Sequence, residues 1–224
     1  MNNIQIAIDG PSGAGKSTIA KSVAKALGIL YLDTGAMYRT VALKGLRSGI
    51  RLSDGGAVAG MLRDTRIDVL HRDGSQRVLL DGEDVSEDIR TNEVSMGASA
   101  VSAHLVVRER LVSLQQDIAR RISVIMDGRD IGTKVLPNAD IKIFLTASPE
   151  ARAKRRFREL QEKGLLDMTY AALLEEIRTR DRNDSNRTHS PLVKAVDAIL
   201  LDTTELDLEE TTNVVMAMIE ARME

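Results

Sequence analysis

The sequence contains no cysteine, which excludes disulfides, thiolate catalysis, iron–sulfur clusters and cysteine-ligated zinc. Aromatic residues make up only 2% of the chain and tryptophan is absent, so the core is expected to be aliphatic, with methionine as a filler. The same scarcity leaves no row of rings on which successive bases could stack, which argues against generic binding of single-stranded nucleic acid. The histidines, His71, His104 and His189, lie too far apart in the sequence to indicate a metal-binding triad.

Long apolar runs and a strong excess of one charge are missing as well. The longest stretch without a charged side chain, residues 94–107, is shorter than the roughly 20 apolar residues that span a bilayer, so no membrane span is expected. The first apolar run has no basic segment before it and is interrupted at Asp9, so we expect no signal peptide and a cytoplasmic location. Because 31 basic residues face 33 acidic ones, any affinity for anions must come from local clusters of cations.

The composition is otherwise that of a soluble globular protein: 224 residues, 43% hydrophobic and 29% charged, enough for one large domain with a full core. Short apolar runs alternate with helical sequence, which predicts right-handed βαβ units and a doubly wound parallel α/β sheet. We expect strands at 4–8, 30–32, 123–126, 141–145 and 198–201, and helices at about 16–27, 35–46, 149–163 and 207–223. Residues 66–85 do not fit this alternation of strands and helices. Their short apolar runs, joined by Asp73-Gly74 and Asp81-Gly82, predict a small antiparallel insertion.

Residues 10–17, with the sequence GPSGAGKS, match the phosphate-binding pattern G-x-x-x-x-G-K-[ST] between an expected strand and an expected helix. In such a P-loop the backbone N–H groups surround a phosphate, the side chain of Lys16 reaches the β and γ oxygens, and the Ser17 hydroxyl can hold Mg²⁺. We interpret Asp9, at the end of the first strand, as a turn residue rather than a catalytic group. Asp127 also ends an apolar strand, and two roles stay open for it: a Walker B carboxylate near Mg²⁺, or a turn or helix-capping residue.

A nucleoside-triphosphate site fits three classes of protein: a kinase for a small acceptor, a GTPase switch, and a motor or ATP-gated binding module. A GTPase would carry a guanine-reading Asn-Lys-x-Asp, but no Asn here is followed by Lys. A motor needs a partner-binding region for which the chain has no room. A compact kinase is therefore favoured, and an ATP-gated binding protein is the alternative outside enzymes.

A kinase for an anionic acceptor needs cations opposite the P-loop, because the donor and acceptor phosphates repel each other until arginines neutralise them. Arg39 and Arg129 each follow the end of an expected strand, where loops at the carboxyl edge of a parallel sheet face the ligand. Two further groups are spaced to share one face of a helix: Arg180, Asp184 and Arg187, and Arg152, Arg155 and Arg156.

With these residues in place, the chain resembles the bacterial-type cytidylate kinases, a family of nucleoside-monophosphate (NMP) kinases. The resemblance rests on residues 8–18, 33–39, 80–85, 127–133 and 180–187. The P-loop is shared with many NTPases, whereas blocks 33–39 and 127–133 together are specific to this family. The resemblance implies a single P-loop kinase domain, 1–224, with its core at 1–60, 105–148 and 190–224. It also implies an NMP-binding β insertion at about 64–97 and a mobile helical lid at about 150–170.

Residue roles transfer by position in these blocks. The implied ATP-binding residues are Gly10, Pro11, Ser12, Gly13, Ala14, Gly15, Lys16, Ser17, Thr18, Arg155 and Arg156. The resemblance implies that the acceptor phosphate is held by Thr34, Arg39, Arg129 and Arg187, its ribose by Arg180 and Asp184, and the cytosine edge by Ser99, Arg108 and Asp130. Catalysis would rest on Lys16, Arg39, Arg129 and Arg187, and Mg²⁺ would lie at Ser17. Many relatives carry Gly at position 17 and Ser at position 34, and both hydroxyls are present here.

The implied activity is transfer of the γ-phosphoryl group of ATP to CMP or dCMP, with Mg²⁺, in pyrimidine nucleotide metabolism. The expected partners are these small substrates, with no nucleic acid and no membrane, and the expected state is a cytoplasmic monomer. Among enzymes, the alternative is a kinase for UMP or another small anionic acceptor.

Overall fold

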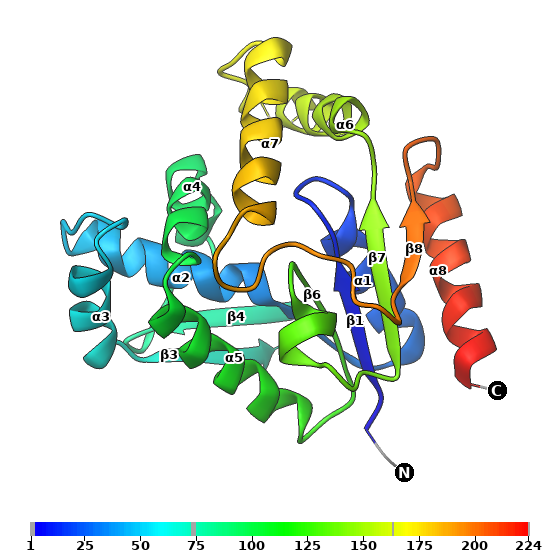
Figure 1. Cartoon of the computed structure of the whole chain (residues 1–224), viewed down its shortest axis with the longest axis horizontal. Helices are drawn as coiled ribbons and strands as arrows, with labels where there is room; N and C mark the ends of the chain where they lie inside the picture. Colours follow the sequence, from blue (N-terminus) through cyan, green and yellow to red (C-terminus); the bar gives the residue numbers. More distant parts are fainter. Residues whose placement is uncertain (1–2, 73–74, 163, 224) are drawn as a thin grey trace. The chain divides into compact units, whose positions relative to one another are not determined.

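The computed structural model of the chain describes residues 3–72, 75–162 and 164–223, which divide into two compact units (Figure 1). The first unit comprises Met1–Leu30 and Ile122–Glu224, and the second comprises Tyr31–Arg121. The predicted division into a core, an NMP-binding insertion and a lid stays a prediction.

A five-stranded sheet forms the centre of the first unit. Four of its strands, β1 (Gln5–Asp9), β6 (Val124–Gly128), β7 (Ile141–Thr146) and β8 (Ile199–Asp202), lie in this unit, and β2 (Leu30–Asp33) begins in it at Leu30 and continues into the second unit. The strand order is β2-β6-β1-β7-β8. The central strand β1 runs parallel to β6 on one side and to β7 on the other, and β8 continues the parallel pairing beyond β7. All five strands fall within a residue or two of the ranges predicted from the sequence. Flanking helices complete the predicted α/β class.

The core of this sheet is aliphatic. Ile6 and Ile8 are fully buried on the central strand, and Ile125 is fully buried on the neighbouring strand β6. Strands covered on both faces carry continuous apolar runs rather than alternating ones. These strands could therefore be predicted from the sequence. Met126 is fully buried as well, in agreement with a core filled by methionine in place of aromatic rings.

The helices of this unit are α1 (Lys16–Leu27), α6 (Pro149–Glu162), α7 (Tyr170–Ser185) and α8 (Leu208–Met223), and a single π turn, η2 (Ile131–Val135), follows β6. The helix α6 begins as predicted, since the Ser148 hydroxyl accepts a hydrogen bond from the Ala151 N–H at 3.2 Å and Pro149 occupies the first turn. The pair α6 and α7 lies beyond the carboxyl end of β7 (Figure 1). A small apolar cluster of Ala153, Leu173 and Ile177 packs these two helices together.

The second unit contains α2 (Thr34–Arg47), α3 (Gly55–Arg63), a short 3₁₀ turn η1 (Asp88–Arg90), α4 (Asn92–Val101) and α5 (Leu105–Ala119). Its antiparallel sheet, in the order β3-β4-β5, is built from β3 (Ile67–Arg72), β4 (Ser75–Leu80) and β5 (Glu83–Asp84). This confirms the predicted small β insertion. The predicted turn at Asp81-Gly82 has positive φ at both residues, 53° and 92°. The predicted turn at Asp73-Gly74 lies outside the described residues.

One helix was not predicted, and one local prediction is wrong. Residues 55–63 form the helix α3, which the sequence did not predict because its run of Gly and Ala resembles a loop; the Asp54 side chain caps it by accepting from the Gly56 and Ala57 N–H groups. The helix α7 ends at Ser185, so Arg187 lies beyond it and not on the helical face predicted for it. Within residues 3–72, 75–162 and 164–223, none of the helices has the length and apolar character needed to cross a membrane.

Candidate active site

The P-loop joins β1 to α1, as its pattern predicted. At Gly10 the φ angle is 148°, and a Cβ built there would lie 1.9 Å from the carbonyl oxygen of Leu145 on the neighbouring strand β7. No side chain fits such an approach. Gly13 and Gly15 also have positive φ, 77° and 86°. The glycines of the motif thus turn the loop between the strand and the helix, which places the positive end of the helix dipole at the loop.

Lys16, the first residue of α1, is buried, and its Nζ donates to the Pro11 carbonyl at 2.7 Å. Burial and, after it, the positive charge of Arg129 lower the pKa of this lysine to about 7, although Asp127 and Asp9 oppose the shift. A buried cation with a second cation nearby gains most from a bound anion. The electrostatics of the loop therefore favour a phosphate ligand.

Ser17 follows in the first turn of α1. Its hydroxyl donates to Asp127 Oδ2 at 2.8 Å, which joins the P-loop to the carboxyl end of β6. This bond favours the Walker B interpretation of Asp127 over a capping role. Hydroxyl and carboxylate oxygens are the hard donors that Mg²⁺ prefers, and that ion usually takes its other ligands from water and substrate phosphates. Among the described residues, no group of three or more His, Cys, Asp or Glu could hold a metal ion.

Asp9, the last residue of β1, has a structural role. Its two carboxylate oxygens accept hydrogen bonds from the Ile131 and Gly132 N–H groups, at 2.8 and 2.7 Å, and so hold the first residues of η2. Burial raises the pKa of Asp9 to about 6, although the two N–H groups oppose the shift. A carboxylate with both oxygens occupied by the backbone supports the interpretation of Asp9 as a strand-end residue and not as a catalytic group.

A buried carboxylate holds the arginines of the first unit together. Asp184, near the end of α7 and only 1% exposed, accepts from Arg129 Nε at 2.7 Å and forms an ion pair with Arg187. Burial alone would raise the pKa of Asp184, but the two guanidinium groups outweigh it and hold that pKa below its usual value. Burial also lowers the pKa of Arg129, but the negative charge of Asp184 outweighs this effect. The pKa of Arg129 is therefore raised above its usual value. Three residues that the sequence assigned to the acceptor are therefore in contact here.

The other predicted residues of this unit occupy separate places. Asp130 is buried immediately after β6, next to Arg129, and Arg180 lies on α7 one turn before Asp184. On α6, the Arg155 guanidinium donates to the carbonyl groups of Thr203, Thr204 and Leu206, in the loop after β8. Arg156 is exposed and pairs with Glu159 at 2.8 Å. The ATP-binding roles of Arg155 and Arg156 stay predictions.

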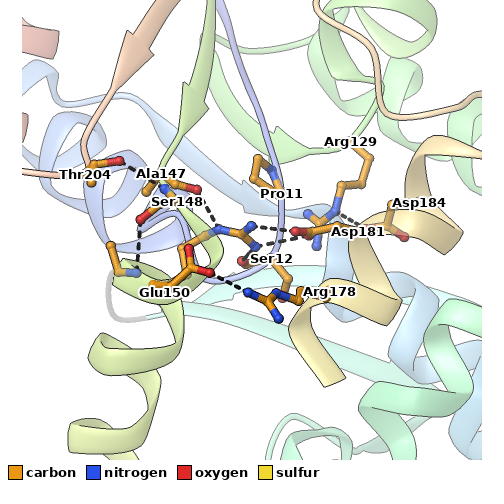
Figure 2. Close-up of polar contacts among 12 residues, drawn as sticks. Pro11, Ser12, Arg129, Ala147, Ser148, Glu150, Arg178, Asp181, Asp184 and Thr204 are labelled. Carbon is orange, nitrogen blue, oxygen red and sulfur yellow. Dashed lines mark hydrogen bonds and ion pairs between the residues drawn. The ribbon is translucent and has the colours of Figure 1, made fainter. Parts of the chain in front are cut away.

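Sequence reasoning missed the role of Arg152, which it placed in the same stripe as Arg155 and Arg156. Arg152 is 2% exposed, and its guanidinium contacts the P-loop carbonyl of Ser12 and the carboxylate of Asp181 on α7. Ser12 and Asp181 are labelled in Figure 2. A pocket of about 440 Å³ lies against this pair and is lined by Pro11, Thr146, Ser148 and Thr204, among others. Its role was missed because the spacing of arginines along a helix does not show which of them is buried.

The remaining acceptor residues belong to the second unit. Thr34 is buried at the start of α2, and Arg39, one turn further on, pairs with Asp33 at 2.9 Å. The Asp33 side chain also caps α2 by accepting from the Ala36 N–H. Sequence reasoning did not assign Asp33 a role, although its position immediately before Thr34 could have suggested that it pairs with Arg39.

Arg108, on α5, is buried in spite of its charge. It donates to the Ser102 carbonyl at 3.2 Å, and its guanidinium carbon lies 5.5 Å from the centre of the Tyr38 ring, a distance typical of a cation–π contact. Ser99 is half-buried on α4. The base-reading roles of Arg108 and Ser99 stay predictions.

The parallel sheet, the P-loop with its Ser17–Asp127 contact and the arginines paired with the buried Asp184 define a phosphotransferase of the P-loop class. A solved structure of similar fold, an uncharacterised protein from Eubacterium ventriosum, covers 97% of this chain and 99% of its own, with a TM-score of 0.54 and 13% identity. The family model for cytidylate kinase matches residues 6–221. The chain is 55% identical over 218 residues to the cytidylate kinase of Caldicellulosiruptor bescii, covering 97% of this chain and 96% of that one. It is 52% identical over 222 residues to the cytidylate kinase of Desulfitobacterium hafniense, covering 99% and 95%. The chain belongs to the cytidylate kinase family.

Proposed function

We propose that this protein transfers the γ-phosphoryl group of ATP to CMP or dCMP, giving ADP and CDP or dCDP. The observation that carries the proposal is the proximity of two kinds of anion site in one unit. Lys16 and the Ser17–Asp127 pair form a triphosphate site, and Arg129, which acts on the pKa of Lys16, is at the same time held by Asp184 beside Arg187. Membership of the family supplies the identity of the acceptor.

In the proposed reaction an oxygen of the acceptor phosphate attacks the γ-phosphorus, and the bond between this phosphorus and the β–γ bridging oxygen breaks, with its electron pair going to ADP. A phosphate oxygen is already anionic, so no strong general base is required. Catalysis then depends on positioning and on neutralising charge. Lys16 neutralises the donor phosphates, and Arg129, Arg187 and Arg39 neutralise the acceptor phosphate. Mg²⁺, bound with the nucleotide at Ser17 and Asp127, would supply further positive charge to the transferring group.

Three residues are proposed to read the base: Ser99, Arg108 and Asp130. A carboxylate at Asp130 accepts a hydrogen bond from the exocyclic amine of cytosine, whereas uracil presents a carbonyl oxygen at that position. With UMP bound, the buried carboxylate would face the carbonyl oxygen of uracil and would lose its water without gaining a hydrogen bond. UMP should therefore be disfavoured. The assignment of Thr34 to the acceptor phosphate, and of Arg180 and Asp184 to its ribose, is part of the same proposal.

The test is ADP formation from ATP and Mg²⁺ with CMP, dCMP, UMP, AMP, GMP and shikimate supplied one at a time, beside a reaction without acceptor. We expect turnover to be strongest with CMP or dCMP. Strongest turnover with UMP or with another small anion would replace the proposed acceptor. Equal ADP formation with every acceptor and with none would indicate a hydrolase, and tight nucleotide binding without turnover would indicate an ATP-gated binding protein.

We also propose that the protein acts as a cytoplasmic monomer on small molecules, without nucleic acid or membrane. The near-neutral net charge and the scarcity of aromatic residues support the part of this proposal that excludes nucleic acid, because both disfavour an extended polyanion-binding surface. Light scattering coupled to gel filtration tests the monomer directly, and retention on immobilised single-stranded DNA at physiological salt would contradict the second part.

A further inference from the structure

The side chain of Arg152 joins three segments of the first unit. Its Nε donates to the Ala147 carbonyl at 2.9 Å, at the end of β7; its Nη1 donates to the Ser12 carbonyl at 2.8 Å, in the P-loop; and both Nη atoms contact the carboxylate of Asp181 on α7, at 3.0 and 2.5 Å (Figure 2). The last contact is bidentate, the geometry in which a guanidinium holds a carboxylate most rigidly. An arginine with 2% exposure thus connects the phosphate-binding loop directly to α7.

The position of Asp181 on α7 gives this connection its significance. Asp181 is adjacent to Arg180 and lies three residues before Asp184, which holds Arg129 and Arg187. Residues three apart lie on neighbouring positions of a helical surface. A movement of α7 that brings Asp184 and its arginines toward a ligand must therefore also move Asp181, and Arg152 transmits that movement to the Ser12 carbonyl.

We propose that Arg152 is a positioning residue that couples the two substrate sites. This proposal rests on the proposed function, and in it Arg152 acts through its contacts with Ser12 and Asp181. Binding of CMP fixes α7, and the pair Arg152–Asp181 then holds the P-loop in the conformation that binds the triphosphate. The affinity for ATP rises when CMP is bound, and by thermodynamic reciprocity the affinity for CMP rises equally when ATP is bound.

A second ion pair between the same two helices provides a matched control. Arg178 of α7 donates to Glu150 of α6 at 2.6 Å, on the exposed surface. Tyr170 adds a hydrogen bond from its hydroxyl to the Glu150 carbonyl. These contacts hold α6 against α7, but none of them involves the P-loop. If coupling needed only an intact pair of helices, both ion pairs would contribute to it; in our account only Arg152–Asp181 does.

The experiment measures the dissociation constant of a non-hydrolysable ATP analogue with Mg²⁺, by calorimetry, with and without saturating CMP. The ratio of the two constants is the coupling factor. For the wild type we expect a factor of about five or more. In Arg152→Met and in Asp181→Asn the factor should fall close to one, while Arg178→Met keeps the wild-type factor. Asp181→Asn retains shape and one acceptor, so it preserves the fold if Arg152→Met does not.

The two substitutions together should lower the factor no further than either alone, because they interrupt one connection. A purely structural role would lower the melting temperature of the Arg152 and Asp181 variants and leave the coupling factor unchanged, which would overturn the proposal. A wild-type factor of one would overturn it as well. Failure of the proposed function is distinguishable, because the wild type would then form no ADP in response to CMP.

Discussion

The Ser17 hydroxyl and the Asp127 carboxylate lie 110 residues apart in the sequence and 2.8 Å apart in the structure, where they join the start of α1 to the end of β6. Both are oxygen donors suited to Mg²⁺ or to its water shell. Asp127→Asn removes a negative charge at this position, so the Mg²⁺ concentration for half-maximal activity should rise by about tenfold or more. Asp54→Asn, at an exposed helix cap in the second unit, is the control for charge loss alone. An unchanged Mg²⁺ midpoint for Asp127→Asn would remove Asp127 from the metal site.

The lowered pKa of Lys16 predicts a proton linkage. With a pKa of about 7 in the folded protein against 10.5 for an unperturbed lysine, Lys16 is mostly neutral at pH 8, and nucleotide phosphates should restore its charge. ATP binding at pH 8 should therefore take up roughly one proton more in the wild type than in Lys16→Met. Calorimetry in buffers of different ionisation enthalpy counts these protons. Equal uptake by the two proteins would contradict the assigned pKa.

The lowered pKa of Lys16 also makes the free energy of unfolding depend on pH. Because the folded protein disfavours charged Lys16, the unfolded chain binds more protons between pH 7 and 10.5, and the free energy of unfolding gains a component that rises with pH over this range. Relative to Lys16→Met, the wild type should therefore become more stable as the pH rises from 7 to 10. Urea denaturation at several pH values measures this difference, and a difference that stays constant or falls with pH would show that Lys16 is charged in the free protein.

Gly10 and Gly15 provide a matched pair of substitutions within the P-loop. A Cβ at Gly10 would lie 1.9 Å from the Leu145 carbonyl oxygen, whereas a Cβ at Gly15 would meet nothing within 4 Å. Gly15→Ala should therefore cost only the strain of a positive φ, about 1–2 kcal/mol. Gly10→Ala must in addition displace β7 from β1, so it should lower the free energy of unfolding by clearly more. Equal losses in urea denaturation would mean that the two strands are not held this closely.

Asp130→Asn tests the base-reading assignment. An amide offers both a donor and an acceptor, so the variant should accept uracil better and cytosine worse than the wild type does. The ratio of kcat/KM for CMP to that for UMP should fall by about tenfold or more, which corresponds to the loss of one hydrogen bond to a charged group. Steady-state kinetics with both acceptors measures the ratio. An unchanged ratio would assign the discrimination to other residues.

Much of the fold was legible in the sequence because buried parallel strands carry continuous apolar runs. The runs that became β1, β6 and β7 were found to within a residue or two. The helix α3 was missed because its Gly-rich sequence has weak helical propensity, and its stability comes from the cap at Asp54 and from burial of Val58 and Leu62. Such tertiary contacts leave no periodic signal in a short segment.

The candidate site, like the fold, has parts that the sequence predicts and parts that it does not. The P-loop could be predicted in detail because its chemistry requires particular residues at fixed spacing. The contact between Ser17 and Asp127 and the burial of Arg152 could not, since each joins segments that lie far apart in the sequence. An ion pair such as Arg152–Asp181 becomes visible only when the helices that carry it are packed.

The central claim is that the γ-phosphoryl group is transferred to the acceptor, and the most direct test follows the atom itself. ATP labelled with ³²P at the γ position is incubated with Mg²⁺, CMP and the protein, and the products are separated. The account predicts one labelled CDP for each ADP formed, with the label in its β-phosphate. Label recovered as inorganic phosphate, with ADP formed and no labelled CDP, would contradict it.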